Sequence, residues 1–159
     1  MTGGQETAAA VRKTLRVDCS VDHAFHTFTE GIGSWWPLQT HSISVMDQGQ
    51  APPETAIVEP QAGGRLYERT HDGRECDWGS VLVWEPPSRL VIEWRVNPAN
   101  PRTEVEVRFV PDGDGTRVEL EHRGWERFAA GRGPVARSSY EEGWDTVLGA
   151  YAAGAGPKT

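Results

Sequence analysis

Two polar side chains, His122 and Glu68, are the residues in this sequence best placed for proton chemistry. In the stretch TRVELEH, His122 has the same parity as Val118 and Leu120, and in RLYERT Glu68 has the parity of Leu66. Alternate residues of a strand point to opposite faces, so we expect both side chains to face the interior. An inward imidazole or carboxylate can orient a ligand or transfer a proton. Because most buried histidines are simply hydrogen-bonded to their neighbours, we favour a binding role over catalysis.

Tryptophan is the second residue type that points to a site, since the chain has seven. The stretch EGIGSWWPLQTHSI sets Trp35 and Trp36 between two glycines and Pro37, with His41 shortly after. Proline disfavours helical geometry at the residue before it, which predicts that the two tryptophans lie on a turn. An indole offers a large apolar surface with one N–H donor, so it suits the wall of a ligand site and the packing of a water-free core equally. Three further candidates come from a strand, a strand-end loop and the last helical stretch: Trp94, Trp125 and Trp144.

Several classes of function are disfavoured by what the sequence contains. The net charge is -7 with only two lysines, so the chain is a poor partner for nucleic acid. There is no glycine-rich phosphate loop and no GxSxG motif, and Cys19 and Cys76 form no CxxC pair. We therefore expect neither a conventional hydrolase nor a nucleotide enzyme, and no metal or cofactor.

The length of 159 residues fits one domain. We predict a single ligand-binding domain over residues 11–153, with flexible segments at 1–10 and 154–159. No apolar run approaches the roughly 18 residues of a membrane span, and no secretory leader is evident, so we expect a cytoplasmic protein without membrane contact. The opening MTGGQ resembles the start of a common epitope tag and could equally be native, so it is left out of the fold prediction.

Hydrophobic periodicity predicts an α+β fold with two kinds of element. Residues 11–17 alternate as a strand, and Ser20 is a plausible N-cap for an amphipathic helix that ends before Gly31 and Gly33. Six strand patterns separated by turn residues then follow between residues 55 and 123, which predicts an antiparallel meander. The stretch 81–84 is apolar on both parities, so its face cannot be assigned. A long helix with an apolar stripe, beginning near Pro134 and ending near Gly154, should cover the concave side of the sheet.

The order of these elements carries a family resemblance, together with short motifs over most of residues 15–152. The motifs are Ala24-Phe25, Trp35-Trp36-Pro37, Gly63-Gly64, Trp78-Gly79-Ser80-Val81, Trp84-Glu85-Pro86-Pro87 with Arg89-Leu90, Trp94, His122 with Gly124-Trp125, and Gly143-Trp144. The chain resembles the helix-grip fold of the START-like, SRPBCC superfamily, in which a curved antiparallel sheet of about six or seven strands wraps around a long C-terminal helix. Within it, the chain is similar to the homologues of the activator of the ninety-kilodalton heat-shock protein's ATPase.

The resemblance implies a cavity for an apolar small molecule, such as a lipid, a polyketide or an aromatic metabolite, between the sheet and the last helix. It implies a lining that includes Trp36, Trp94, Trp125 and Trp144, with His41 near the mouth and His122 and Glu68 orienting the ligand. Two alternatives stay open because fold does not select function. One is a co-chaperone-like interaction module that contacts a chaperone or client, and the other is a cyclase or aromatase-like enzyme with His122 and Glu68 as acid and base. Dimerisation through an exposed strand edge also stays open.

Overall fold

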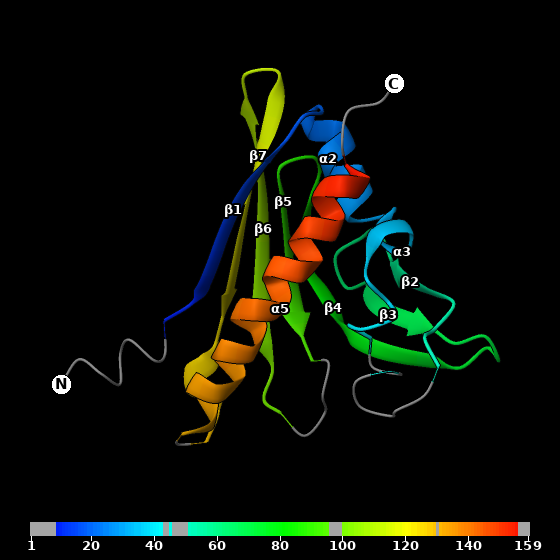
Figure 1. Ribbon diagram of the computed structural model, residues 1–159, viewed down its shortest axis with the longest axis vertical. Helices are drawn as coiled ribbons and strands as arrows, with labels where there is room; N and C mark the ends of the chain where they lie inside the picture. The colour runs from blue at the N-terminus through cyan, green and yellow to red at the C-terminus, as the bar shows by residue number, and fades with distance from the viewer. Residues whose placement is uncertain (1–8, 43–44, 46–50, 96–99, 130, 156–159) are drawn as a thin grey trace.

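A seven-stranded antiparallel sheet curves around one long helix in the computed structural model (Figure 1). The structure describes residues 9–42, 45, 51–95, 100–129 and 131–155. The sheet order is β1-β7-β6-β5-β4-β3-β2, so the strands from β2 to β7 form the predicted meander, and β1 closes its far edge against β7. The strands are β1 (Val11–Val17), β2 (Thr55–Val58), β3 (Arg65–Arg69), β4 (Glu75–Glu85), β5 (Arg89–Trp94), β6 (Thr103–Asp112) and β7 (Gly115–Arg123).

The helices begin and end largely where the sequence predicts. In α2 (Val21–Phe28), the Ser20 hydroxyl accepts a hydrogen bond from the His23 backbone N–H at 3.1 Å, which confirms the predicted N-cap. The long α5 (Arg132–Gly154) carries Pro134 in its first turn and ends at Gly154, as predicted. The predicted terminal segments lie mostly outside the described residues, which begin at residue 9 and end at residue 155.

The tryptophan pair is the clearest difference from the predicted local structure. Trp36 is the C-cap of the short α3 (Ile32–Trp35), and its ψ of 134° is the extended geometry expected before Pro37. Trp35, however, is the last residue of α3, so the predicted turn is confirmed for Trp36 and wrong for Trp35. A four-residue helix still fits between Gly31 and Pro37 because the proline restricts only the residue directly before it.

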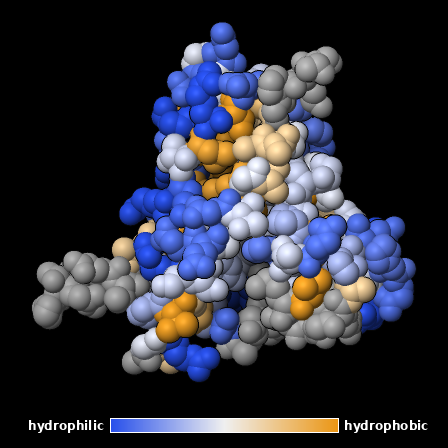
Figure 2. All heavy atoms as spheres, in the orientation of Figure 1, coloured by the Kyte–Doolittle hydropathy of each residue, from blue (hydrophilic) through white to orange (hydrophobic). Residues whose placement is uncertain are grey.

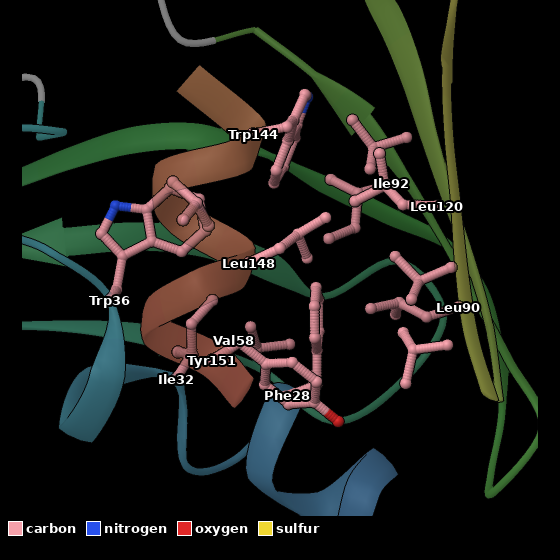
Figure 3. Close-up of a cluster of buried hydrophobic side chains, with 14 of the residues drawn as sticks. Phe28, Ile32, Trp36, Val58, Leu90, Ile92, Leu120, Trp144, Leu148 and Tyr151 are labelled. Carbon is pink, nitrogen blue, oxygen red and sulfur yellow. The ribbon is translucent and has the colours of Figure 1, made fainter. Parts of the chain in front are cut away.

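The concave side of the sheet is filled by side chains from α5 and from the two short helices (Figure 3). Trp144, Leu148 and Tyr151 of α5 meet Leu90, Ile92 and Leu120 of the sheet, while Phe28 and Ile32 close one end. Apolar side chains remain in view between β1 and the C-terminal half of α5 (Figure 2). The helix is therefore held over the sheet mainly by buried apolar area, which is the dominant stabilising contribution in such packing.

Two irregularities in β4 settle the face that the sequence left open. The pairing with β3 shifts at Trp78, and the pairing with β5 shifts between Val81 and Val83, so each site carries one extra residue. Val81 is consequently buried, whereas Leu82 is 43% exposed. The strand is apolar on both parities because the second shift changes which residues face the interior.

The outer face of the sheet carries a network of ion pairs centred on Glu106 of β6. The carboxylate accepts hydrogen bonds from Arg89 at 2.7 Å and from Arg123 at 2.7 Å, and it pairs with Arg108 at 2.9 Å. The Glu106 side chain is only 5% exposed because these guanidinium groups cover it. The scattered arginines of the sequence thus form a solvated and paired sheet face.

Candidate functional site

Four tryptophans from four different elements meet on the concave side of the sheet. Trp36 of the α3 C-cap lies 4.8 Å from Trp78 of β4 between ring centroids, and Trp78 lies 6.1 Å from Trp94 of β5. Trp144 of α5 is 5.6 Å from Trp94 and 6.0 Å from Trp36. All four side chains are buried. The folding of the chain thus builds a continuous aromatic cluster from segments far apart in the sequence.

His122 lies at one end of this aromatic cluster and is fully buried on the inward face of β7, as predicted. The Trp144 indole N–H donates to its Nδ1 at 3.0 Å, and its Nε2 lies 2.7 Å from the Thr103 hydroxyl oxygen. An indole nitrogen can only donate, so Nδ1 must be the accepting nitrogen. In the neutral ring the proton is therefore on Nε2 and is donated to Thr103.

The surroundings of His122 favour the uncharged ring. Trp125 lies 4.4 Å and Tyr140 4.8 Å from it between ring centroids, so the imidazole is enclosed by aromatic carbon. Desolvation by burial lowers the pKa of His122 to about 3. At neutral pH the side chain is therefore uncharged and is held in place by its two hydrogen bonds. It lacks the second ring proton of the imidazolium form, which is the proton a histidine general acid would donate.

Glu68 also faces the interior, as its parity predicts, and is fully buried on β3. Its Oε1 accepts the Trp78 indole N–H at 2.7 Å. Three strands, β4, β5 and β6, separate it from His122 on β7, and the Trp78 and Trp94 rings lie between the two residues. The two polar residues are thus both internal, but the structure does not bring them together.

A crevice opens beside His122, near the N-terminal part of α5. It is lined by four aromatic residues, Trp94, Trp125, Phe128 and Tyr140, and by Arg95, Asn100, Pro101 and Thr103. The Trp94 indole N–H donates to the Tyr140 hydroxyl at 3.0 Å, and the Trp125 indole N–H donates to the His122 carbonyl at 3.0 Å. The crevice has room for about one water, and its empty space, including the open mouth, is about 230 Å³.

The segment around Trp36 and His41 lies at the other side of the aromatic cluster and does not line this crevice. The Trp36 indole N–H donates to the His41 carbonyl at 2.7 Å, which fixes the loop against the ring. The half-buried His41 ring lies about 3.9 Å from the position that a Cβ would take at Gly143 of α5, and burial lowers the His41 pKa. Trp35 packs instead on Phe28 and Tyr151, so it belongs to the core.

Sequence reasoning missed four residues that complete this region: Trp78, Thr103, Phe128 and Tyr140. Tyr140 is on the apolar stripe of the last helix, where its hydroxyl could have marked it. Trp78 occupies the first irregularity of β4, so strand parity gave no signal for it. Thr103 shares the parity of Val105 and Val107, and a threonine on that face was the available signal. Among the described residues, no three His, Cys, Asp or Glu side chains lie close enough together to hold a metal ion.

Comparison with solved structures finds relatives that cover nearly the whole chain. A self-sacrificing resistance protein, CalC from Micromonospora echinospora, is 28% identical with a TM-score of 0.69, covering 96% of this chain and 99% of that chain. An anthrahydroquino-γ-pyrone synthase is 35% identical with a TM-score of 0.56, covering 88% of this chain and 86% of that chain. CalU16 from the same Micromonospora species is 23% identical with a TM-score of 0.62, covering 93% and 76%, and supports the fold alone. Comparison with curated proteins finds no match.

A family match over most of the chain identifies the family. Residues 18–152 match the family described as activator of Hsp90 ATPase homolog 1-like protein, which is most of the chain. The helix-grip arrangement of the sheet and α5 agrees with that match and with the structural relatives. No helix among residues 9–42, 51–95, 100–129 and 131–155 is long and apolar enough to cross a membrane. The chain belongs to the family of activator of Hsp90 ATPase homolog 1-like proteins, within the START-like, SRPBCC helix-grip superfamily.

Proposed function

We propose that this protein binds a planar aromatic small molecule, of the polyketide type, between the sheet and α5. The observation that carries the proposal is the crevice beside His122, whose walls are the rings of Trp94, Trp125, Phe128 and Tyr140. Ligand sites are mostly apolar with a few placed polar groups, and here the polar lining residues are Arg95, Asn100 and Thr103. The relative named as an anthrahydroquino-γ-pyrone synthase supports a small-molecule ligand of this class.

Entry of such a ligand requires a side chain to move. The crevice has room for about one water, which is far less than an aromatic ring system needs, although the empty space including its open mouth is about 230 Å³. Phe128 is half-buried at the end of the short 3₁₀ helix η1 (Trp125–Arg127), and its ring lies 5.9 Å from Trp125 between centroids. Because no hydrogen bond holds a phenyl ring, rotation of Phe128 is the least costly way to open the crevice.

Calorimetric titration of the purified protein with 9,10-anthraquinone-2-sulfonate tests the proposal, with native mass spectrometry as a check on stoichiometry. We expect saturable binding of one molecule per chain. The variant Trp125→Leu should weaken binding about tenfold or more, because it removes one aromatic wall. Trp35→Leu is the matched control, since both indoles are buried and both donate to a backbone carbonyl, and it should leave the Kd unchanged. Equal effects of the two substitutions, or no saturable binding to the wild type, would refute the site.

A second candidate is a cyclase-like enzyme, which the 35% identity to the pyrone synthase favours. His122 and Glu68 are the residues that the sequence offered as acid and base. Three strands separate the two residues, so a single reacting carbon could not meet both. Burial also keeps His122 uncharged at neutral pH, because it lowers the pKa of the ring to about 3. Turnover of a linear polyketide that survives both His122→Ala and Glu68→Gln would remove these two residues from the mechanism.

Three predictions from the sequence remain: an interaction with a chaperone or client, a homodimer and a cytoplasmic location. They stay predictions. A pull-down that recovers no chaperone would count against the first, and sedimentation at micromolar concentration would decide the second.

A further inference from the structure

We propose that the Thr103 hydroxyl donates a hydrogen bond to a carbonyl oxygen of the molecule bound in the crevice. This inference rests on the proposed function and narrows its ligand to planar aromatic ketones or quinones. Thr103 is the first residue of β6, has the parity of the inward-facing Val105 and Val107, and lines the crevice.

The direction of the hydrogen bonds around His122 determines which proton Thr103 can offer. The Trp144 indole must donate to Nδ1, so the Nε2 proton is directed at the Thr103 oxygen, 2.7 Å away. Thr103 therefore accepts from His122, and its own hydroxyl proton is not used in that contact. Within the described part of the chain, the Thr103 side chain has no other hydrogen-bond partner.

Because Thr103 is buried, its hydroxyl proton has few partners other than a bound molecule. Thr103 is 3% exposed, so its hydroxyl has little access to bulk water. A buried hydroxyl that does not donate loses a hydrogen bond it would make in water, and an occupant with an acceptor at that position restores it. Donation from the His122 N–H to the oxygen also polarises the hydroxyl and strengthens it as a donor.

The rest of the crevice suits an aromatic ring system whose hydrogen-bond acceptor is an uncharged carbonyl oxygen. The wall rings offer faces and edges for stacking, and the Trp94 and Trp125 N–H groups already have acceptors in the protein. A neutral donor such as a threonine hydroxyl complements a neutral acceptor such as a quinone oxygen without the desolvation cost of a buried charge.

Two probes of the same outline test the proposal: 9,10-anthraquinone-2-sulfonate, which has the two ring carbonyls, and anthracene-2-sulfonate, which lacks them. We expect Thr103→Val to weaken binding of the quinone about threefold to tenfold, the effect of one lost hydrogen bond, and to leave the Kd for the anthracene unchanged. The readout is the ratio of the two Kd values, because a general loss of packing or stability changes both probes alike.

Two further variants keep the test sharp. Thr103→Ser retains the hydroxyl and should keep the wild-type ratio. Thr116→Val removes a buried hydroxyl at the other end of the sheet, where the side chain donates to the Cys19 carbonyl at 2.9 Å, and should also keep the ratio. If both probes bind and Thr103→Val changes them equally or not at all, the role of Thr103 is wrong while the proposed function stands. If neither probe binds to the wild type, the proposed function fails and this inference fails with it.

Discussion

His122 is a titratable side chain enclosed by rings, and its burial couples protonation to unfolding. In the unfolded chain a histidine pKa is about 6.5, whereas in the folded protein burial lowers it to about 3. Between pH 6.5 and pH 3, His122 therefore binds a proton in the unfolded state but not in the folded state. The free energy of unfolding must consequently fall as the pH falls toward 3.

The free energy of unfolding should consequently drop by about 2 kcal/mol between pH 7 and pH 5 from this one residue. Urea titrations at pH 7, 6 and 5 measure the drop. The variant His122→Gln should lack it, because an amide can still accept from Trp144 and donate to Thr103 without titrating. A wild type and a variant with parallel pH dependence would show that folding does not lower the pKa of His122.

Among the described glycines in strands, Gly79 of β4 leaves the least room for a side chain. A Cβ at Gly79 would lie 2.0 Å from the Glu93 carbonyl oxygen of β5, a contact with rigid backbone. A Cβ at Gly149 of α5 would meet nothing within 4 Å. Replacing glycine by alanine should thus lower the stability of the protein at Gly79 in the strand and raise it at Gly149 in the helix.

We expect Gly79→Ala to destabilise the protein by more than about 2 kcal/mol, because β4 must separate from β5 to admit the methyl group. Gly149→Ala should stabilise it by about 0.5–1 kcal/mol, since alanine is the better helix former. Thermal unfolding of the two variants beside the wild type measures both effects. A mild effect of Gly79→Ala would mean that the β4–β5 ladder yields more readily than its geometry suggests.

The outer face of the sheet depends on Glu106 as the shared partner of three arginines. Burial acts to raise its pKa, but hydrogen bonds from Arg89 and Arg123 and the charge of Arg108 outweigh this and lower it to about 2. A depressed carboxyl pKa stabilises the fold above the unfolded value of about 4.3, and the contribution is lost as the pH falls toward 2.

At pH 7 we expect Glu106→Gln to cost on the order of 2 kcal/mol, with a difference from the wild type that shrinks below about pH 4. The control is Glu119→Gln, whose carboxylate pairs with the partly exposed Arg117 at 2.8 Å and, among the described residues, with no other cation; it should cost less than about 1 kcal/mol. Chemical denaturation at pH 7 and pH 3 compares them. A loss from Glu106→Gln that is the same at both pH values would arise from packing and not from charge.

The sequence predicted the regular elements well and the irregular ones poorly, for a physical reason. Parity placed His122 and Glu68 inside correctly, because the side chains of an unbroken strand alternate without exception. It could not assign residues 81–84 and gave no signal for Trp78, because an extra residue at each irregularity of β4 changes the face. The pairing of Thr103 with His122 joins residues 19 apart on neighbouring strands, so it required the register as well as the parity.

At the scale of the whole molecule, the crevice lies where several elements meet. Its lining comes from β5, β6, the short 3₁₀ helix and α5. In the unfolded chain these residues are separate, so a ligand held by all of them binds only the folded state. Binding must then stabilise the whole fold and not merely the rim of the site.

The expected size of this stabilisation follows from mass action. At a free 9,10-anthraquinone-2-sulfonate concentration 100 times its Kd, the free energy of unfolding should rise by about 2.7 kcal/mol, which corresponds to roughly 5–10 °C in the melting temperature of a domain of this size. Differential scanning calorimetry over a series of ligand concentrations measures the shift, and the Kd recovered from it should agree with the isothermal titration. Trp125→Leu should reduce the shift at a fixed ligand concentration, while Trp35→Leu should lower the starting melting temperature and preserve the shift. Tight binding without any shift would mean that the probe binds the unfolded chain equally well, which an assembled site between the sheet and α5 does not allow.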